Sequence, residues 1–167
     1  MKSTFDNWYV DKMRANPEIS AETDKAEALL DEVRTIAIVG ISRNRHRDSH
    51  FVGRYLKKVG YRIIPVNPGA DEILGEKAYP DLASIPEPVD VVDIFRPPEA
   101  IPEVVEEALK IEPKAIWLQL GTGTHNALKE EVESNGIQFF QNRCMKVDHQ
   151  FLIRPKTENK QQEQPVS

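Results

Sequence analysis

TIAIVGISRNRHRDSHFVGRYLKKVGYRIIPVNP, residues 35–68, is the stretch from which the expected fold of this chain follows. It begins with a short apolar run rich in β-branched residues, 35–39, and ends with a second one, 61–66. Residues 49–59 between them show a helical pattern and are followed by Gly60, a residue type that often ends helices. A strand, a helix and a second strand in this order predict a βαβ unit, with parallel strands and a right-handed crossover.

The same alternation continues toward the C-terminus. Further short runs, bounded by Gly, Pro, Asn or Asp, predict strands at residues 89–95, 115–120 and 136–140. Helical patterns cover residues 98–111 and 124–135. Lys77-Ala78-Tyr79 predicts a short edge strand, and residues 81–85 predict a single helical turn. We therefore predict an α/β fold: a Rossmann-like, doubly wound parallel sheet with strand order 3-2-1-4-5-6, in a three-layer α/β/α arrangement.

The two ends of the chain differ from the segment between them. Residues 1–20 mix polar, aromatic and Pro residues without a clear period, and predict an arm that lies on the domain. The domain is expected over residues 21–153, including a first helix that Ser20 or Thr23 caps. Residues 154–167 are rich in Gln, Lys, Glu and Pro, and predict a disordered tail.

Composition narrows the class of protein. The chain has 167 residues, 22 Lys and Arg against 27 Asp and Glu, a net charge of −5 and 40% hydrophobic residues, which suits one ordinary core. The acidic balance argues against a nucleic-acid binder, and no apolar run is long enough to span a membrane. A single cysteine, Cys144, cannot pair within the chain and is typical of a reducing compartment. We expect a soluble cytoplasmic protein with neither a nucleic-acid nor a membrane partner.

A change of strand order in such a sheet predicts a ligand site beyond the carboxyl ends of the strands. Two loops are expected there, residues 40–49 and residues 95–98. The first overlaps a basic segment, residues 43–58, whose formal net charge is +5, and it leads into a helix N-terminus. Two interpretations are open: a site for a phosphorylated ligand, or a charged loop that is simply solvated.

Small residues in the first loop favour the anion site. Gly40 comes directly after a strand and allows the backbone to approach a ligand. Ser42 and Ser49 offer hydroxyl groups to phosphate oxygens. For Ser49 the first interpretation is a helix N-cap, with phosphate contact as a second role.

The end of the second strand helps to identify the ligand. A dinucleotide site has the motif G-x-G-x-x-G and an acidic residue at this position. Here the strand ends VNPG, residues 66–69, and the next acidic residues, Asp71 and Glu72, follow the turn. This disfavours NAD and allows ligands that carry an additional phosphate, NADP or coenzyme A (CoA).

Five segments within residues 35–149 carry a resemblance to a known family. They read TIAIVGIS, HRDSHFVGRYLKKVGYRIIPVNPG, EILGEKAYPDLASIPEPVDVVDIFRPPE, AIWLQLG and NRCMKVDH. This stretch resembles the small stand-alone CoA-binding proteins, whose domain is similar to the CoA-binding domain of the succinyl-CoA synthetase α subunit. It departs from the family's usual R-P-S-[YF] at residues 47–50, which read RDSH.

The resemblance implies that the chain binds CoA or an acyl-CoA. The residues that it implies as CoA-binding are Gly40, Ile41 and Ser42 at the phosphates, Arg47 and Ser49 as further phosphate contacts, Asn67 and Pro68 beside the adenine, and Phe95 and Arg96 at the far wall.

We expect binding without catalysis and without a metal, because no motif pairs a nucleophile with a base at a recognisable spacing. Cys144 has two interpretations: a thiol made reactive by Arg143 and Lys146, or a structural residue of the core. The alternative functions are an NADP-dependent oxidoreductase, a redox protein acting through Cys144, and a non-catalytic subunit of a CoA ligase or transferase. A homodimer or a separate protein partner is expected besides the small-molecule ligand.

Overall fold

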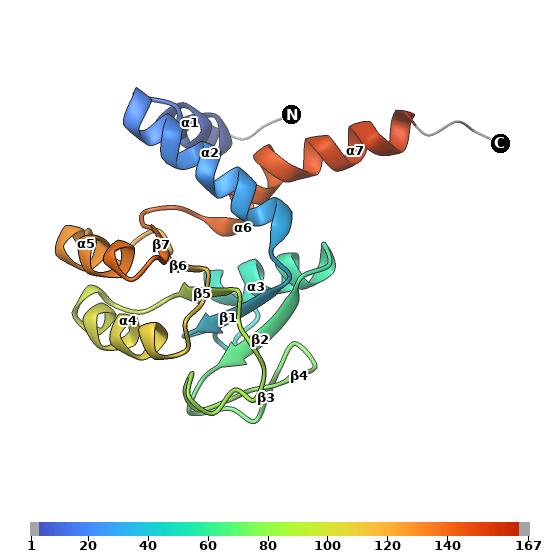
Figure 1. The fold of residues 1–167 in the computed structure, drawn as a ribbon. Helices are drawn as coiled ribbons and strands as arrows, with labels where there is room; N and C mark the ends of the chain where they lie inside the picture. The colour runs from blue at the N-terminus through green and yellow to red at the C-terminus, as the bar shows by residue number, and fades with distance from the viewer. Residues whose placement is uncertain (1–3, 164–167) are drawn as a thin grey trace. The chain divides into compact units, whose positions relative to one another are not determined.

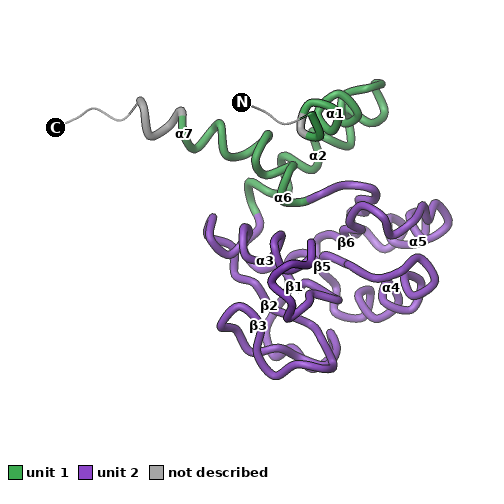
Figure 2. Tube along the Cα trace, turned by 180° about the vertical axis from the view of Figure 1, so that it is seen from behind, with its two compact units in different colours: residues 1–32, 145–167 green, residues 33–144 purple. Residues whose placement is uncertain are grey.

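The computed structural model describes residues 4–163. The chain forms two compact units, shown in different colours in Figure 2. The larger unit is continuous and spans residues 33–144, and the smaller one combines the two chain ends, up to residue 32 and from residue 145. The larger unit contains the whole parallel sheet and both loops of the predicted ligand site.

The centre of the larger unit is a five-stranded sheet with the order β2-β1-β5-β6-β7 (Figure 1). All neighbouring strands are parallel, which confirms the predicted doubly wound α/β fold. The strands are β1 (Thr35–Val39), β2 (Arg62–Val66), β5 (Val91–Ile94), β6 (Ala115–Leu118) and β7 (Gln138–Phe140).

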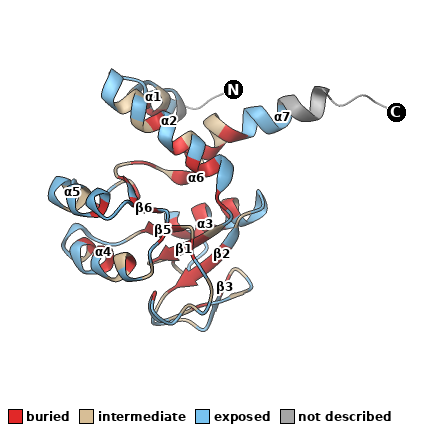
Figure 3. Ribbon diagram, in the orientation of Figure 1, coloured by how far each residue is buried: buried red, intermediate tan, exposed pale blue. Residues whose placement is uncertain are grey.

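Helices cover both faces of this sheet, which explains why its strands are nearly continuous apolar runs (Figure 3). On one face, α4 (Ile101–Lys110), which follows the 3₁₀ turn η1 (Pro98–Ala100), and α5 (Asn126–Ser134) pack into a core that includes Val39. On the other face lies α3 (Asp48–Lys58), where a methyl group added to Gly53 would come within 3.4 Å of Ile38.

The predicted edge strand is reduced to a single residue. Tyr79 forms one parallel bridge with Val66, beside β2 and therefore at the expected edge of the sheet. Lys77 belongs instead to a two-stranded hairpin, β3 (Glu72–Ile73) with β4 (Glu76–Lys77). The turn of this hairpin has positive φ at both central residues, Leu74 and Gly75, the geometry that matches the twist of short hairpins.

Residues 81–85 form a turn and not the predicted helical turn. Asp81 Oδ1 accepts hydrogen bonds from the backbone N–H of Ser84, at 2.8 Å, and from its hydroxyl, at 2.6 Å. The Asp81 side chain therefore satisfies a backbone donor that a longer helix would have used.

The described part of the predicted arm, residues 4–20, is largely helical: it forms α1 (Thr4–Met13) and the first turn of α2 (Pro17–Glu32). The rest of α2 is the helix that the sequence predicts after Ser20 or Thr23. The second helix begins before Ser20, because Asn16 Oδ1 accepts a hydrogen bond from Ile19 N at 2.8 Å and so caps it.

The described part of the predicted disordered tail, residues 154–163, is helical and forms α7 (Arg154–Glu163). It follows α6 (Met145–Asp148) and the π-helical turn η2 (His149–Ile153). Arg154 and Glu158, one turn apart in α7, form an ion pair at 3.0 Å. The last part of the predicted tail, residues 164–167, lies outside the described residues. No helix within residues 4–163 is long and apolar enough to cross a membrane.

Candidate functional site

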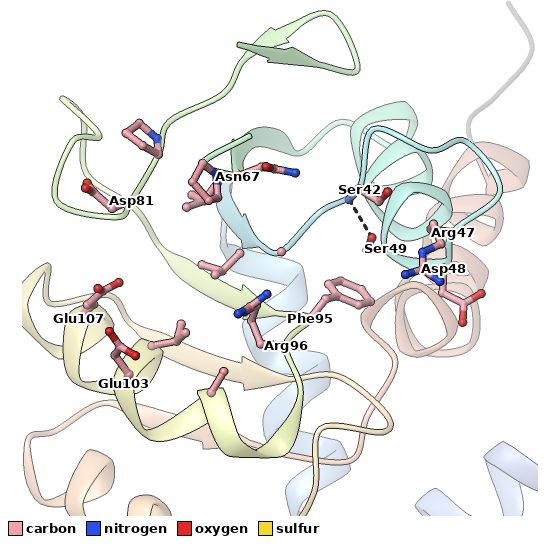
Figure 4. A pocket seen from close by; sticks show the side chains of 17 residues that line it. Ser42, Arg47, Asp48, Ser49, Asn67, Asp81, Phe95, Arg96, Glu103 and Glu107 are labelled. Atoms are coloured by element: carbon pink, nitrogen blue, oxygen red, sulfur yellow. Dashed lines mark hydrogen bonds between the residues drawn. The ribbon is translucent and has the colours of Figure 1, made fainter. Parts of the chain in front are cut away.

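A cavity of about 740 Å³ lies at the carboxyl ends of β1, β2 and β5. These are the strands between which the order of the sheet changes direction, the usual position of a ligand site in this fold class. Every residue of the predicted site except Ile41 lines this cavity (Figure 4), namely Gly40, Ser42, Arg47, Ser49, Asn67, Pro68, Phe95 and Arg96.

Ile41 has a different position. Its side chain is fully buried, and its Cδ1 atom would lie 2.7 Å from a methyl group added to Gly53 of α3. Its carbonyl oxygen accepts a hydrogen bond of 2.9 Å from Asn67 Nδ2. Ile41 therefore packs in the core beneath the loop, and its carbonyl oxygen anchors Asn67, which does line the cavity.

Gly40 closes the wall between β1 and β5. Its φ is +86°, and its N–H donates to Val66 O at 3.0 Å. A Cβ at this position would lie 2.1 Å from the carbonyl oxygen of Phe95. Glycine is therefore required here because the loops after β1 and β5 approach each other closely, while the approach of a ligand to this backbone stays a prediction.

The loop between β1 and α3 is held by its two serines. Ser42 N–H donates to Ser49 Oγ at 3.0 Å, and Ser42 Oγ accepts from Asn44 N at 3.0 Å. The N-cap position of α3 is Arg47, without a side-chain cap, so the N-cap interpretation of Ser49 is wrong. Both hydroxyl oxygens act here as acceptors, and each hydroxyl still has its own hydrogen to donate to a ligand.

Asn67 joins the loops after β1 and β2. Its Nδ2 atom donates to Ile41 O at 2.9 Å, and its Oδ1 atom accepts from Gly69 N at 2.7 Å. Both polar atoms of the amide are thus engaged within the protein. Asn67 positions the wall of the cavity, and Pro68 beside it adds an apolar surface.

Two arginines provide the positive charge of the cavity. Arg47 lies at the start of α3, where the helix N-terminus adds a partial positive charge, and Arg96 follows β5. Within residues 4–163, neither guanidinium group has an ion-pair or hydrogen-bond partner. Unpaired arginines in a cavity are suited to bind a phosphate group.

The rest of the basic segment does not converge on the cavity. Lys57 donates to Leu74 O at 2.6 Å and pairs with Glu76 at 3.3 Å, and Arg54 lies over the ring of Phe51 at 4.9 Å. Of the basic residues at positions 43–58, only Arg47 lines the cavity. Most charges of this segment therefore do not belong to the predicted anion site, and Arg54 and Lys57 make contacts within the chain instead of being simply solvated.

The structure adds an acidic wall that the sequence analysis missed. Asp81, Glu103 and Glu107 line the end of the cavity away from α3, and Asp48 lies near Arg47 at the other end (Figure 4). Glu103 and Glu107 are one turn apart on α4, so that both face the same side of the helix. Neither forms an ion pair within the described part of the chain.

A buried carboxyl lies near the site without lining it. Asp93 of β5 is fully buried, and its Oδ1 atom accepts a hydrogen bond of 2.8 Å from Gln119 Nε2. Its Oδ2 atom has no hydrogen-bond partner among residues 4–163. Burial raises the pKa of Asp93 from 3.8 to about 8, so the group is largely protonated at neutral pH.

The remaining candidates for chemistry lie elsewhere. Cys144 is half-buried and does not line the cavity. Arg143, which the reactive interpretation of Cys144 invokes, is itself buried, and its carbonyl oxygen accepts a hydrogen bond of 3.0 Å from Trp117 Nε1. Within residues 4–163, no group of His, Cys, Asp and Glu residues is arranged to hold a metal ion.

Comparison with known proteins gives concordant matches. The model of a family described as "CoA binding domain" matches residues 34–150. An uncharacterized protein of Bacillus subtilis, YneT, is 38% identical over 121 residues, which are 72% of this chain and 89% of that protein. The solved structure of a Thermus thermophilus protein, cell-free ID.343, has 37% identity and a TM-score of 0.74, and the match covers 78% of this chain and 98% of that one.

A ligase is also similar to part of the chain. The acetate–CoA ligase (ADP-forming) II of Archaeoglobus fulgidus is 38% identical over 76 residues, 44% of this chain but only 11% of the ligase. The similarity thus concerns a small part of a much larger enzyme. Since the family model spans most of the chain and includes every strand of the sheet, the protein belongs to the CoA-binding domain family.

Proposed function

We propose that this protein binds CoA or an acyl-CoA in the cavity at the carboxyl ends of β1, β2 and β5, without catalysing a reaction of its own. The observation that supports this most directly is a cavity of about 740 Å³ lined by two arginines, Arg47 and Arg96, which have no partner among the described residues. The volume is within the range of small-molecule sites. The pyrophosphate of CoA is the natural partner for two guanidinium groups beside a helix N-terminus.

The other residues of the site have complementary roles in this proposal. The hydroxyl groups of Ser42 and Ser49 donate to phosphate oxygens, while their oxygen atoms hold the loop in place. The half-buried ring of Phe95 and the ring of Pro68 provide apolar surfaces for the adenine and the pantetheine arm. Gly40 and Asn67 act on the ligand indirectly, by fixing the two loops that carry these groups.

Calorimetric titration of the full chain with CoA, acetyl-CoA, NAD and NADP tests the proposal. We expect both CoA ligands to bind, and NAD and NADP to bind much more weakly. Binding of NADP without any signal from CoA would favour the oxidoreductase alternative and overturn the proposal. A cytoplasmic location is consistent with CoA binding and stays a prediction.

A second candidate is a subunit of a CoA ligase, and the similarity to the Archaeoglobus fulgidus ligase favours it. In that case the chain presents CoA to a separate, nucleotide-binding polypeptide. Affinity purification of the tagged chain from its own cells, followed by mass spectrometry, tests this. Recovery of a nucleotide-binding ligase subunit in a fixed ratio supports it, and recovery of a monomer or homodimer alone counts against it.

A further inference from the structure

A long excursion of the chain begins and ends at the cavity. Residues 69–79, the hairpin segment, leave the sheet after β2 and contain the β3–β4 hairpin. The segment is closed at its base, because the N–H of Asn67 donates to Tyr79 O at 2.9 Å. The residues that flank it on both sides line the cavity (Figure 4), namely Asn67, Pro68, Pro80 and Asp81. The position of the hairpin segment therefore affects one wall of the cavity.

Lys57 of α3 holds the tip of the hairpin segment. Its Nζ atom donates to Leu74 O at 2.6 Å and lies 3.3 Å from Glu76 Oε1. Leu74 has a φ of +57°, a left-handed conformation that residues other than glycine keep only where their surroundings enforce it. The hydrogen bond from Lys57 thus reaches a residue of the turn whose backbone conformation is unfavourable by itself.

The same face of α3 also supports the loop after β1. Gly53 lies one turn before Lys57 on this face. A methyl group added to Gly53 would lie 3.1 Å from Leu74 Cδ1 and 2.7 Å from Ile41 Cδ1. The carbonyl oxygen of Ile41 accepts the hydrogen bond from Asn67 Nδ2 at 2.9 Å. The hairpin segment and the loop after β1 are therefore joined twice, through α3 and through Asn67.

We infer that Lys57 is a positioning residue of the CoA site: it holds the hairpin segment on α3 and so fixes a wall of the cavity without contacting the ligand. The inference rests on the proposed function and adds to it a residue that does not line the cavity. When the ammonium group of Lys57 is removed, the hairpin segment is free to occupy further positions, and only the molecules with a formed wall bind the ligand fully. The apparent affinity falls with the fraction of such molecules.

Calorimetric titration of the full chain with CoA, for the wild type and for Lys57→Met, tests this inference. Methionine keeps most of the length of the lysine side chain and removes its ammonium group. We expect the dissociation constant to rise about threefold to fivefold, which corresponds to the upper part of the range for a partly exposed ion pair. Lys57→Arg keeps a charged donor, and its affinity is expected to stay within about twofold of the wild type.

Two further variants separate positioning from net charge. Lys58→Met removes the same charge from the next position of α3, which is exposed and does not line the cavity, and it is expected to leave the affinity unchanged. Glu76→Gln removes a negative charge, so electrostatics alone would tighten the binding of an anionic ligand. Because Glu76 is the other half of the ion pair with Lys57, we expect its substitution to weaken CoA binding instead.

Amide hydrogen exchange of the ligand-free protein gives a second readout. Within the hairpin segment, the N–H of Ala78 donates to Asp71 O at 2.9 Å. Lys57→Met is expected to speed the exchange of residues 69–79 and to leave that of β1 and β5 unchanged. In the wild type, CoA is expected to slow the exchange of the same segment, because the coupling between two sites is reciprocal.

The outcomes separate the inference from the proposed function. Equal weakening by Lys57→Met and Lys58→Met, or tighter binding by Glu76→Gln, would make the role of Lys57 one of charge, and the inference would be wrong while CoA binding stands. A Lys57→Met variant with a lower free energy of unfolding but the wild-type affinity would show a purely structural role and would also overturn the inference. If the wild type does not bind CoA, the proposed function is wrong, and the inference is wrong with it.

Discussion

The ionisable side chain that follows β5 and the one inside this strand differ in their exposure to solvent. Arg96, after the strand, lies in an open cavity and has no partner within the described residues. Asp93, within the strand, is fully buried, and in the described part of the chain Gln119 is the one residue that donates a hydrogen bond to it. An exposed charge keeps its hydration until a ligand replaces it, whereas a buried carboxyl is stable only in its neutral form. Arg96 is therefore available to bind a ligand, whereas Asp93, three residues earlier in the chain, affects only the stability of the fold.

Asp93→Asn gives the largest expected effect. The pKa of Asp93 is about 8 in the folded protein and 3.8 is its ordinary value, so the unfolded chain loses this proton first as pH rises. Stability from this group is therefore complete below about pH 4 and is lost as pH rises toward 8, at up to about 1.4 kcal/mol per pH unit. The asparagine variant lacks this dependence, and urea unfolding between pH 5 and pH 8 measures the difference in slope.

The control for this comparison is Glu106→Gln, which removes an exposed carboxyl from α4. Its profile of unfolding free energy against pH is expected to follow that of the wild type. If the free energy of unfolding of Asp93→Asn changes with pH as that of the wild type does, Asp93 is ionised in the folded protein. The stated difference between a neutral Asp93 and a charged Arg96 would then be wrong.

Gly40→Ala tests the close approach of the loops after β1 and β5, at Gly40 and Phe95. The added Cβ would lie 2.1 Å from Phe95 O, and φ is +86°, so the loops after β1 and β5 must move apart. We expect a loss of about 3 kcal/mol in the free energy of unfolding, together with weaker CoA binding.

Gly60→Ala separates backbone strain from the clash. Gly60 also has positive φ, at +111°, but a methyl group there would meet nothing within 4 Å. Its loss is expected to be about 1 to 2 kcal/mol, without an effect on ligand affinity. Equal losses of stability in the two variants would show that the clash of the added methyl group with Phe95 O costs nothing beyond the backbone strain.

Arg47→Ala tests whether an exposed arginine of the cavity contributes to ligand binding and not to stability. Because Arg47 has no partner within residues 4–163, its removal is expected to leave stability unchanged and to weaken CoA binding by about 1.5 to 3 kcal/mol, the scale for a hydrogen bond to a charged group. Titration calorimetry measures the affinity. Arg45→Ala, which removes an exposed arginine of the same loop that does not line the cavity, is the control for net charge.

Local patterns explain which parts of this structure could be predicted. The strands are nearly continuous apolar runs, and the carboxyl ends of parallel strands meet at one edge, so Gly40, Asn67 and Arg96 could be placed together from sequence alone. The predicted edge strand at residues 77–79 is longer than the single bridge formed by Tyr79, because Lys77 pairs with Glu72 in a separate hairpin.

Side-chain direction explains what could not be predicted. The charge of residues 43–58 was added up along the sequence, but of these basic residues only Arg47 lines the cavity. Lys57, for example, donates to Leu74 O and pairs with Glu76 instead. Glu103 and Glu107 have a visible spacing of one turn, yet only the packing of α4 shows that this side faces the cavity. Asp81 joins them through the turn at residues 81–85, where the sequence pattern predicts a helical turn.

Cys144→Ser is expected to have the smallest effect. Cys144 is half-buried and does not line the cavity, and substitutions away from a binding site usually change free energies by less than about 0.5 kcal/mol. CoA affinity, measured by the same titration, is therefore expected to stay within about twofold of the wild type. A loss as large as that of Arg47→Ala would place the thiol in contact with the ligand and would favour the redox alternative. Retained affinity would leave the arginines, and not the thiol, as the groups through which this fold holds CoA.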